Sequence, residues 1–344
     1  MKILYGVQAT GNGHISRARQ MQPELAKHGV EMDFLFSGRE RKKLFDMEQF
    51  GNFEVRRGLT FSTKSGKIDV GSTLLHANFA QLSLDVQKID LSGYDLILSD
   101  YEPVVAWAAK LQGKEVIGLG HQYAFRYPIP QVRGTLVDQM LLENFAPAEK
   151  FCGLHYHHFG YPILPPIIRE IQASGDSSTE PFVLVYLPFE RRSAITKALR
   201  SIRDFRFEVF HPECEKAYTK GNISWNPPSS SRFTEKLAES ERVLCNAGFM
   251  LTSEVISLNK PLLVKPVAAQ PEQQSNALAI DELGLGRTMQ ALNKRAIREW
   301  LEDSRPAKRV EFGAAGPMIA EWIANGCEDS VKKLSKRVWK AALS

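Results

Sequence analysis

Residues 245–286 read CNAGFMLTSEVISLNKPLLVKPVAAQPEQQSNALAIDELGLG, and this stretch decides the fold. The pattern predicts a strand end, a glycine turn at Gly248, a helix, the short apolar strand 262–264, a proline-rich loop and a second helix. Such alternation is typical of a parallel sheet covered by helices on both faces. A glycine ahead of a helix also lets a ligand approach the backbone, where the helix N-terminus attracts phosphate.

Polar side chains in the same stretch suit a nucleotide sugar. The carboxylate of Glu254 can accept two hydrogen bonds from a ribose diol. Gln273, Gln274 and Asn276 open the next helix and offer neutral polar contacts to a sugar. An ordinary helix–strand–helix unit with polar helix starts fits the stretch equally well, so the rest of the chain has to decide.

The same alternation extends over the whole chain and predicts two α/β domains that meet near residue 165. The tandem prolines of Gly160–Ile168 indicate an extended linker there. Strands are expected at 2–8, 30–36, 53–57, 94–99, 115–119, 151–159, 182–187, 206–210, 221–225, 242–245 and 262–264. Helices are expected at 18–28, 39–47, 72–89, 104–111, 136–145, 191–200, 233–239, 293–301, 307–312, 318–325 and 328–343.

Composition limits the class of protein. The chain has 344 residues and a net charge of +5, with 44 basic residues spread among 39 acidic ones, which argues against nucleic-acid binding. The four cysteines form no CxxC pair and the histidines at 155, 157 and 158 lack partner ligands, so we expect neither a metal nor a disulfide framework. No apolar run reaches the ~18 residues of a membrane span. We therefore expect a cytoplasmic protein without a cofactor.

Two basic clusters, at residues 39–43 and 332–337, are expected to be solvated helix faces. Contact with anionic lipid is the alternative, and it would make the protein peripheral at the inner face of the membrane.

The segment Gly11-Asn12-Gly13-His14-Ile15-Ser16-Arg17 follows the first strand and differs from a dinucleotide-binding fingerprint in lacking the third glycine. His14 would lie at a helix N-terminus facing the cleft, where the positive helix end favours a neutral imidazole that can accept a proton. Arg17 could reach a phosphate. A capping or turn-filling histidine and a surface arginine are the alternatives.

Further polar residues follow later strands and are expected at the same edge of the sheet. Asp100 could bind sugar hydroxyls or assist a base, or it could cap a helix together with Glu102. His121 fits a site histidine and a buried, hydrogen-bonded one equally. In the second half, the loop that contains Glu190 is similar to a ligand loop before a helix, where Arg191 and Arg192 could offset diphosphate charge. A charge pair on a solvated helix start is the alternative, and it is favoured for Arg192.

Taken together, these segments resemble the GT-B glycosyltransferases of the family 1/28 type. The group that is closest in pattern contains the N-acetylglucosaminyltransferase of peptidoglycan lipid II synthesis. The resemblance rests on Gly248, Ser253-Glu254, Lys260-Pro261, Pro266, Gln273-Gln274 and Asn276-Ala277, on Gly11-Asn12-Gly13-His14, and on His121-Gln122. DYEP and GYPILPP are similar to segments of a less characterised bacterial and archaeal branch.

The resemblance implies two Rossmann-like domains, 1–165 for the acceptor and 166–325 for the donor, with a last helix in 326–344 that returns to domain one. It implies that Glu254 binds ribose, that the backbone at Gly248 meets the diphosphate, and that Gln273, Gln274 and Asn276 contact the donor sugar. His14 would be the acceptor base. The expected activity is metal-independent transfer from a nucleotide sugar, with UDP as the first candidate nucleotide, to a saccharide or lipid-linked acceptor. A nucleotide-sugar hydrolase or epimerase and a non-catalytic binder are the alternatives.

Overall fold

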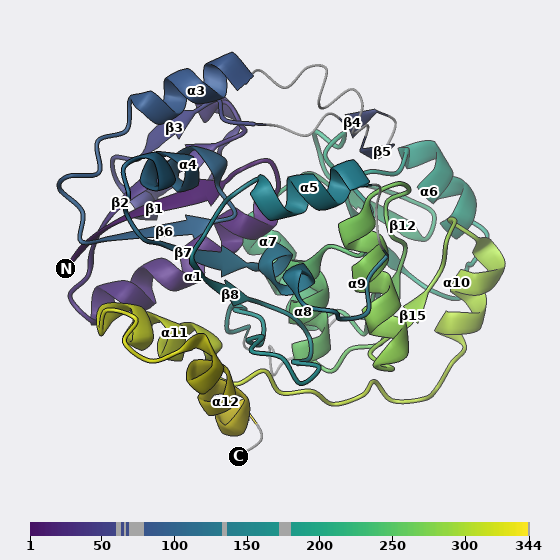
Figure 1. Cartoon of the computed structure of the whole chain (residues 1–344). Coiled ribbons are helices and arrows are strands. Elements are labelled where there is room, and N and C mark those ends of the chain that lie inside the picture. Colours follow the sequence, from purple (N-terminus) through teal and green to yellow (C-terminus); the bar gives the residue numbers. More distant parts are fainter. Residues whose placement is uncertain (60–62, 65–66, 69–78, 133–135, 172–179, 343–344) are drawn as a thin grey trace.

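The computed structural model describes residues 1–59, 63–64, 67–68, 79–132, 136–171 and 180–342. It contains two mainly parallel sheets, as expected from the strand pattern (Figure 1). The first sheet has the order β3-β2-β1-β6-β7-β8 and is parallel throughout. Its strands are β1 (Lys2–Gln8), β2 (Glu31–Ser37), β3 (Glu54–Arg56), β6 (Leu96–Asp100), β7 (Val116–Gly120) and β8 (Lys150–Gly153).

The second sheet has the order β11-β12-β10-β9-β13-β14-β15, and only β11 runs antiparallel to its neighbour. Its strands are β9 (Val183–Tyr186), β10 (Phe207–Phe210), β11 (Tyr218–Lys220), β12 (Ile223–Asn226), β13 (Arg242–Cys245), β14 (Leu262–Val264) and β15 (Arg287–Thr288). A separate hairpin pairs β4 (Thr63–Lys64) with β5 (Lys67–Ile68). The strands β9, β13 and β14 are short apolar runs and are buried, because helices cover both faces.

Helices connect and cover these strands. In the N-terminal half they are α1 (Asn12–Lys27), α3 (Phe79–Gln87), α4 (Pro103–Leu111) and α5 (Leu136–Asn144), with the 3₁₀ segments η1 (Arg41–Lys43), η2 (Glu48–Phe50) and η3 (His121–Arg126). In the C-terminal half they are α6 (Arg192–Leu199), α7 (Ser230–Glu239), α8 (Phe249–Ser257), α9 (Pro271–Glu282) and α10 (Lys294–Leu301).

The end of the chain returns to the first sheet. Helix α11 (Ala315–Ala324) packs against α1, and α12 (Val331–Ala342) contacts β8 and α11 (Figure 1). Ser335 Oγ and Trp339 Nε1 of α12 both donate to the carbonyl of Ile163, at 2.7 and 2.8 Å. The predicted return of the C-terminal helix is therefore confirmed.

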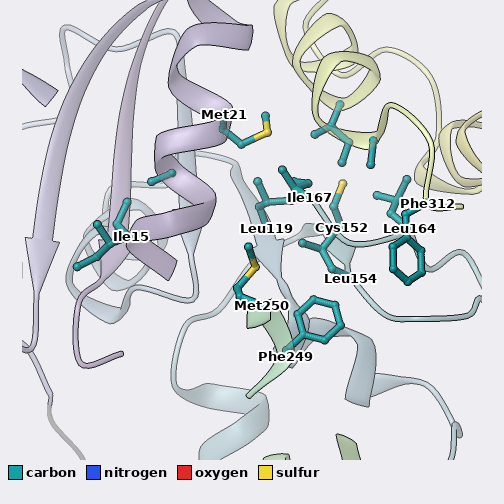
Figure 2. Packing of buried hydrophobic residues seen from close by; sticks show 14 of the residues in the cluster. Ile15, Met21, Leu119, Cys152, Leu154, Leu164, Ile167, Phe249, Met250 and Phe312 are labelled. Carbon is teal, nitrogen blue, oxygen red and sulfur yellow. The ribbon is translucent and has the colours of Figure 1, made fainter. Parts of the chain in front are cut away.

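One apolar core joins the two sheets. Figure 2 shows Ile15 and Met21 of α1, Leu119 and Cys152 of the first sheet, and Phe249 and Met250 of α8 within the same cluster. Leu164, Ile167 and Phe312 continue it toward the C-terminal helices. Because Leu164 and Ile167 are buried, the proline-rich connection is packed rather than free in solvent.

Three predicted elements differ from the structure. Within residues 39–47 only the short η1 is helical, because the five charged residues at 39–43 offer no apolar stripe to bury. The strand predicted at 151–159 ends at Gly153, beyond which a single bridge pairs Leu154 with Leu164. Residues 307–312 are not helical; Val310 and Phe312 alternate with exposed charged residues, which is an extended pattern.

Two helix boundaries also differ. Helix α1 begins at Asn12, six residues before the predicted start, so the glycine segment is itself the helix N-terminus. Of the helix predicted over 72–89, only Phe79–Gln87 is described, and residues 72–78 lie outside the described part.

Candidate functional site

The carboxyl ends of strands from both sheets border one cleft of about 1480 Å³. Gln8, Tyr101 and His121 line it just at or after β1, β6 and β7, and Tyr186 and Asn246 line it at β9 and β13. Parallel α/β sheets bind ligands at this edge, because loops and helix N-termini gather there. The fold therefore places the two predicted halves of the site on opposite walls of one cleft.

A histidine, an aspartate and an arginine form a compact cluster on the first wall. His14 lies in the first turn of α1, and its Nδ1 is 2.6 Å from Oδ1 of Asp100, the last residue of β6. Arg17, one turn further along α1, donates from Nε and Nη2 to the two Asp100 oxygens at 2.7 and 2.5 Å. Asp100 is 0% exposed, whereas the His14 side chain keeps 13% of its surface exposed.

The charge of Asp100 fixes the proton arrangement of His14. Burial opposes ionisation of this carboxyl, but Arg17 and His14 outweigh it and lower the pKa of Asp100 below its ordinary value. An ionised carboxylate can only accept hydrogen bonds, so Nδ1 of His14 carries the hydrogen. The other nitrogen, Nε2, is then left with a free electron pair that can accept a proton.

Two helix N-termini meet at the cleft. Helix α1 begins after Gly11 and α8 after Gly248, and neither has a side chain capping its first amides. A Cβ at Gly13 would come within 3.2 Å of Met250 in α8, whereas one at Gly248 would meet no protein atom within 4 Å. Unsatisfied amides and the positive ends of both helices therefore favour an anion at this junction.

Glu254 is buried beside an arginine that sequence analysis did not single out. Arg169 donates from Nε to Glu254 Oε1 at 2.6 Å and also contacts Thr234. Burial raises the pKa of Glu254, and Arg169 opposes that rise. Since a carboxylate has several acceptor positions, Arg169 fixes its orientation and leaves capacity for a hydroxyl from the cleft.

His121 is buried in the contact between the two halves. Its Nδ1 is 2.7 Å from the Leu154 carbonyl oxygen, and its Nε2 is 2.6 Å from the side-chain amide of Asn276 on α9. Its ring stacks on Phe249 of α8 with centroids 3.8 Å apart and an interplanar angle of 4°. Burial lowers the pKa of His121. His121 is thus buried and hydrogen-bonded, and it also borders the cleft, so its role as a site residue stays a prediction.

The other predicted residues divide between the cleft and the interior. Gly248, Glu254 and Gln273 line the cleft on the wall of the second sheet, and Gly11, Asn12, Gly13, His14 and Arg17 line it on the other wall. Gln273 Oε1 accepts a hydrogen bond from the Val267 amide. Ser253 is buried and donates to the Phe249 carbonyl, and Asn276 donates to the Ala247 carbonyl. Gln274 lies on α9 outside the cleft lining.

The predicted diphosphate loop of the second half also points elsewhere. Glu190 pairs with Lys265, and Arg191 is exposed at the start of α6 without lining the cleft. The guanidinium of Arg192 packs over the Trp225 ring instead of facing the cleft. Phe189, which directly precedes Glu190 in the chain, is 46% exposed and lines the cleft.

The cleft also contains residues that sequence analysis missed. They are Arg39, which donates to Asn12 and the Thr10 carbonyl, Arg169, Phe189, Gln122 and Glu272. Arg39 was assigned to a solvated helix face, but it folds back over the start of α1. The sequence does point to Gln122 and Glu272, because they are next to His121 and Gln273, which were singled out as candidate site residues.

No described group of three or more His, Cys, Asp or Glu side chains is arranged to hold a metal ion. All four cysteines are buried and free.

Comparison with known proteins now defines the family. Residues 1–304 match the family model described as glycosyl transferase family 1. The chain belongs to this family. It is 21% identical to an uncharacterized glycosyltransferase of Methanosarcina acetivorans, over 90% of each chain. A relative from Methanosarcina mazei has the same identity and covers 90% of this chain and 93% of its own.

Solved structures share the fold of this family 1 chain over almost its whole length. The glycosyltransferase of kitacinnamycin has a TM-score of 0.59 at 14% identity and 99% coverage of both chains. MurG of Acinetobacter baumannii has a TM-score of 0.52 at 13% identity, covering 99% of this chain and 94% of MurG. Streptomyces SsfS6 in complex with thymidine diphosphate has a TM-score of 0.56 at 14% identity, with 99% and 100% coverage. The GT-B fold and a glycosyltransferase enzyme are thus confirmed.

In this family 1 enzyme Glu102 caps a helix and does not line the cleft. Its carboxylate accepts from the amides of Val104 and Val105 at 2.8 and 2.7 Å at the start of α4. Burial raises its pKa to about 7, although the Ser37 hydroxyl and these amides oppose the rise. The residue that caps α4 is therefore Glu102, and not Asp100 as the capping alternative had it.

The raised pKa of Glu102 predicts a loss of stability with rising pH. A carboxyl with a higher pKa in the folded than in the unfolded state stabilises fully below pH ~4.5, and that contribution is lost as pH rises through about 7. We expect the free energy of urea unfolding of the wild type to fall, relative to Glu102→Gln, between pH 5 and 8. Parallel pH profiles of the two proteins would contradict the assigned pKa.

Proposed function

We propose that this enzyme transfers a sugar from a nucleoside-diphosphate donor to a hydroxyl of an acceptor, with His14 as the base. The observation that carries the proposal is that His14, oriented by Asp100, lies in the helix N-terminus that meets the start of α8. The acceptor hydroxyl gives its proton to His14 Nε2 while its oxygen bonds to the anomeric carbon. The bond from that carbon to the diphosphate breaks, and the diphosphate leaves with the electron pair.

The donor fits the wall formed by the second sheet. The uncapped amides of α8 suit the diphosphate, and Glu254 suits the ribose hydroxyls. Tyr186, Phe189 and Phe233 line the cleft beyond Glu254 and offer aromatic faces for a base. The amides of α1 approach the same diphosphate position from the other wall, so both halves would stabilise the departing charge.

The donor nucleotide is proposed to be a pyrimidine diphosphate, with UDP first. Support comes from the resemblance at Gly248, Glu254 and Gln273 and from the thymidine diphosphate bound by SsfS6, a protein of the same fold. The acceptor side is lined by Phe125, Tyr127 and Leu142. An acceptor that combines an apolar part with a sugar hydroxyl, free or lipid-linked, fits such a wall.

None of the described helices is both long and apolar enough to cross a bilayer. Lys332, Lys336 and Lys340 are exposed along one side of α12, so this helix is where we propose that peripheral contact with anionic lipid would occur.

A nucleotide panel tests the function. Calorimetry with UDP, TDP, GDP and CMP should give micromolar binding of at least one diphosphate, followed by transfer when the matching sugar nucleotide is offered with an acceptor library. Absence of binding by every nucleotide would sink the proposal. Binding without turnover would instead favour the non-catalytic alternative.

The role of Glu254 can be tested with a matched ligand pair. We expect Glu254→Gln to weaken UDP binding about tenfold, because hydrogen bonds to a charged group contribute about 1.5–3 kcal/mol. The wild type should bind 2′,3′-dideoxy-UDP about tenfold more weakly than UDP, because the hydroxyls that Glu254 would contact are missing. The Glu254→Gln variant should bind the two nucleotides with nearly the same affinity. The exposed Glu282→Gln on the same domain is the control. If the losses of affinity from the substitution and from removal of the ribose hydroxyls were additive, Glu254 would not contact the ribose.

A further inference from the structure

The side chain of Gln122 connects the two walls of the cleft directly at the proposed base. It lies in η3, one residue after His121, and only 8% of it is exposed. Its Nε2 is 3.1 Å from Oε2 of Glu272 in the first turn of α9 and 3.4 Å from Nε2 of His14. One amide group therefore spans from the donor wall to the imidazole.

The hydrogens of this arrangement can be assigned. In the neutral imidazole, the form that can act as a base, Nδ1 donates to Asp100 and Nε2 keeps a free electron pair that can only accept. The amide nitrogen of Gln122 has two hydrogens, one for Glu272 and one for His14. With the amide oxygen and nitrogen of Gln122 exchanged, the oxygen would face the Glu272 carboxylate and the electron pair of His14 Nε2, which is unfavourable. The electron pair that would take the proton from a hydroxyl is thus covered.

This position of Gln122 is held by few interactions. Its Oε1 is buried and has no hydrogen-bond partner among the described residues. A buried acceptor without a donor costs free energy, and the hydrogen bond from the Gln122 side-chain amide to His14 is long. The covering group can therefore be displaced by a competing hydroxyl that forms a shorter bond to His14 Nε2.

We propose that Gln122 is a specificity-determining gate that covers His14 Nε2 until an acceptor hydroxyl displaces it. The gate would act against water. In the competing hydrolysis, water would bond to the anomeric carbon, lose its proton to His14 Nε2 and release the nucleoside diphosphate. A donor that binds beside Glu272 would break the hydrogen bond from Gln122 to that carboxylate. An acceptor that is held by its own contacts in the cleft would then replace the hydrogen bond from Gln122 to His14. This inference rests on the proposed function, because it takes His14 as the base.

The covering of His14 can be tested without any substrate. Diethylpyrocarbonate reacts with an unprotonated imidazole nitrogen, and peptide mass spectrometry resolves its rate at each histidine. We expect Gln122→Met, which keeps the length but lacks the N–H donors, to raise the rate at His14 about five-fold, the effect of one modest hydrogen bond. The rate at exposed His28 is the internal control, and Gln131→Met, with its contacts to Phe125 and Tyr127, is the matched variant.

The catalytic consequence needs a donor. With UDP-N-acetylglucosamine, or the member of the nucleotide-sugar panel that is turned over, we expect Gln122→Met to raise free-sugar release about five-fold relative to transfer. Gln122→Ala provides a second, smaller side chain in case the methionine packs poorly, and thermal unfolding checks both folds.

Each outcome decides something. Unchanged labelling of His14 in both folded variants overturns the gate, whatever the transfer rate. Faster labelling with an unchanged ratio of hydrolysis to transfer also overturns it, because the amide would then cover the base without selecting against water. If no donor is turned over, the proposed function fails, and the labelling result alone supports or overturns the position assigned to Gln122.

Discussion

Replacing His14 by alanine is expected to lower the rate of sugar transfer by about 10²–10⁴-fold, the usual contribution of a positioned general base. The loss should fall on kcat, because the side chain takes the acceptor proton only as the new bond forms. Nucleotide binding should change little, since the donor contacts proposed here come from the backbone amides of α1 and α8 and from Glu254, not from the His14 side chain. Transfer kinetics and calorimetry with the same nucleotide separate the two effects.

The control is His28→Ala, at the exposed end of the same helix. If His14→Ala kept more than about a tenth of wild-type kcat, a role far below that of a general base, the assignment of His14 would be wrong. If it lost nucleotide binding as strongly as transfer, His14 would act on the donor rather than on the acceptor.

Replacing Asp100 by asparagine is expected to be the most damaging single change for stability. It leaves the fully buried guanidinium of Arg17 without its anion, and breaking a buried ion pair in this way costs about 3–5 kcal/mol. Transfer should also fall strongly, because an amide can donate to His14 Nδ1 and stabilise the wrong tautomer. Urea unfolding and kinetics measure the two losses.

A double variant separates the effect of the unpaired Arg17 charge from the effect of Asp100 on the orientation of His14. Arg17→Met together with Asp100→Asn should recover part of the lost stability, since the uncompensated charge is gone, but none of the activity. An Asp100→Asn protein as stable as the wild type would contradict the ion pair as the cause. Recovery of activity in the double variant would contradict the orientation of His14 by Asp100.

Much of the fold and the central cluster can be predicted from the sequence. Buried apolar runs separated by helical periods are enough to predict two parallel sheets. His14 follows β1 and Asp100 ends β6, and these strands pair in parallel with Val7 beside Asp100, so the two residues are neighbours because of the topology. The start of α1 was missed because glycine and asparagine at 11–13 have low helix propensity, whereas packing of Gly13 against Met250 requires that turn.

The donor side is less predictable, because both faces of α8 and α9 are buried and periodicity does not say which face meets the ligand. Ser253 and Asn276 therefore point inward although they share a motif with Glu254 and Gln273. Arg169 lies in an irregular connection, where no periodic pattern predicts its direction. Its pairing with Glu254 depends on contacts 85 residues apart, which only the assembled fold provides.

The packed connections described above also restrict motion. The chain passes between the sheets twice, and Leu164 and Ile167 of the first passage and Phe312 at the end of the second are buried in the same cluster (Figure 2). Two crossings that are anchored in one cluster favour rotation of the halves about that cluster over separation of the halves. We therefore expect the cleft to open mainly by rotation, which a fluorescence distance measured across it would report.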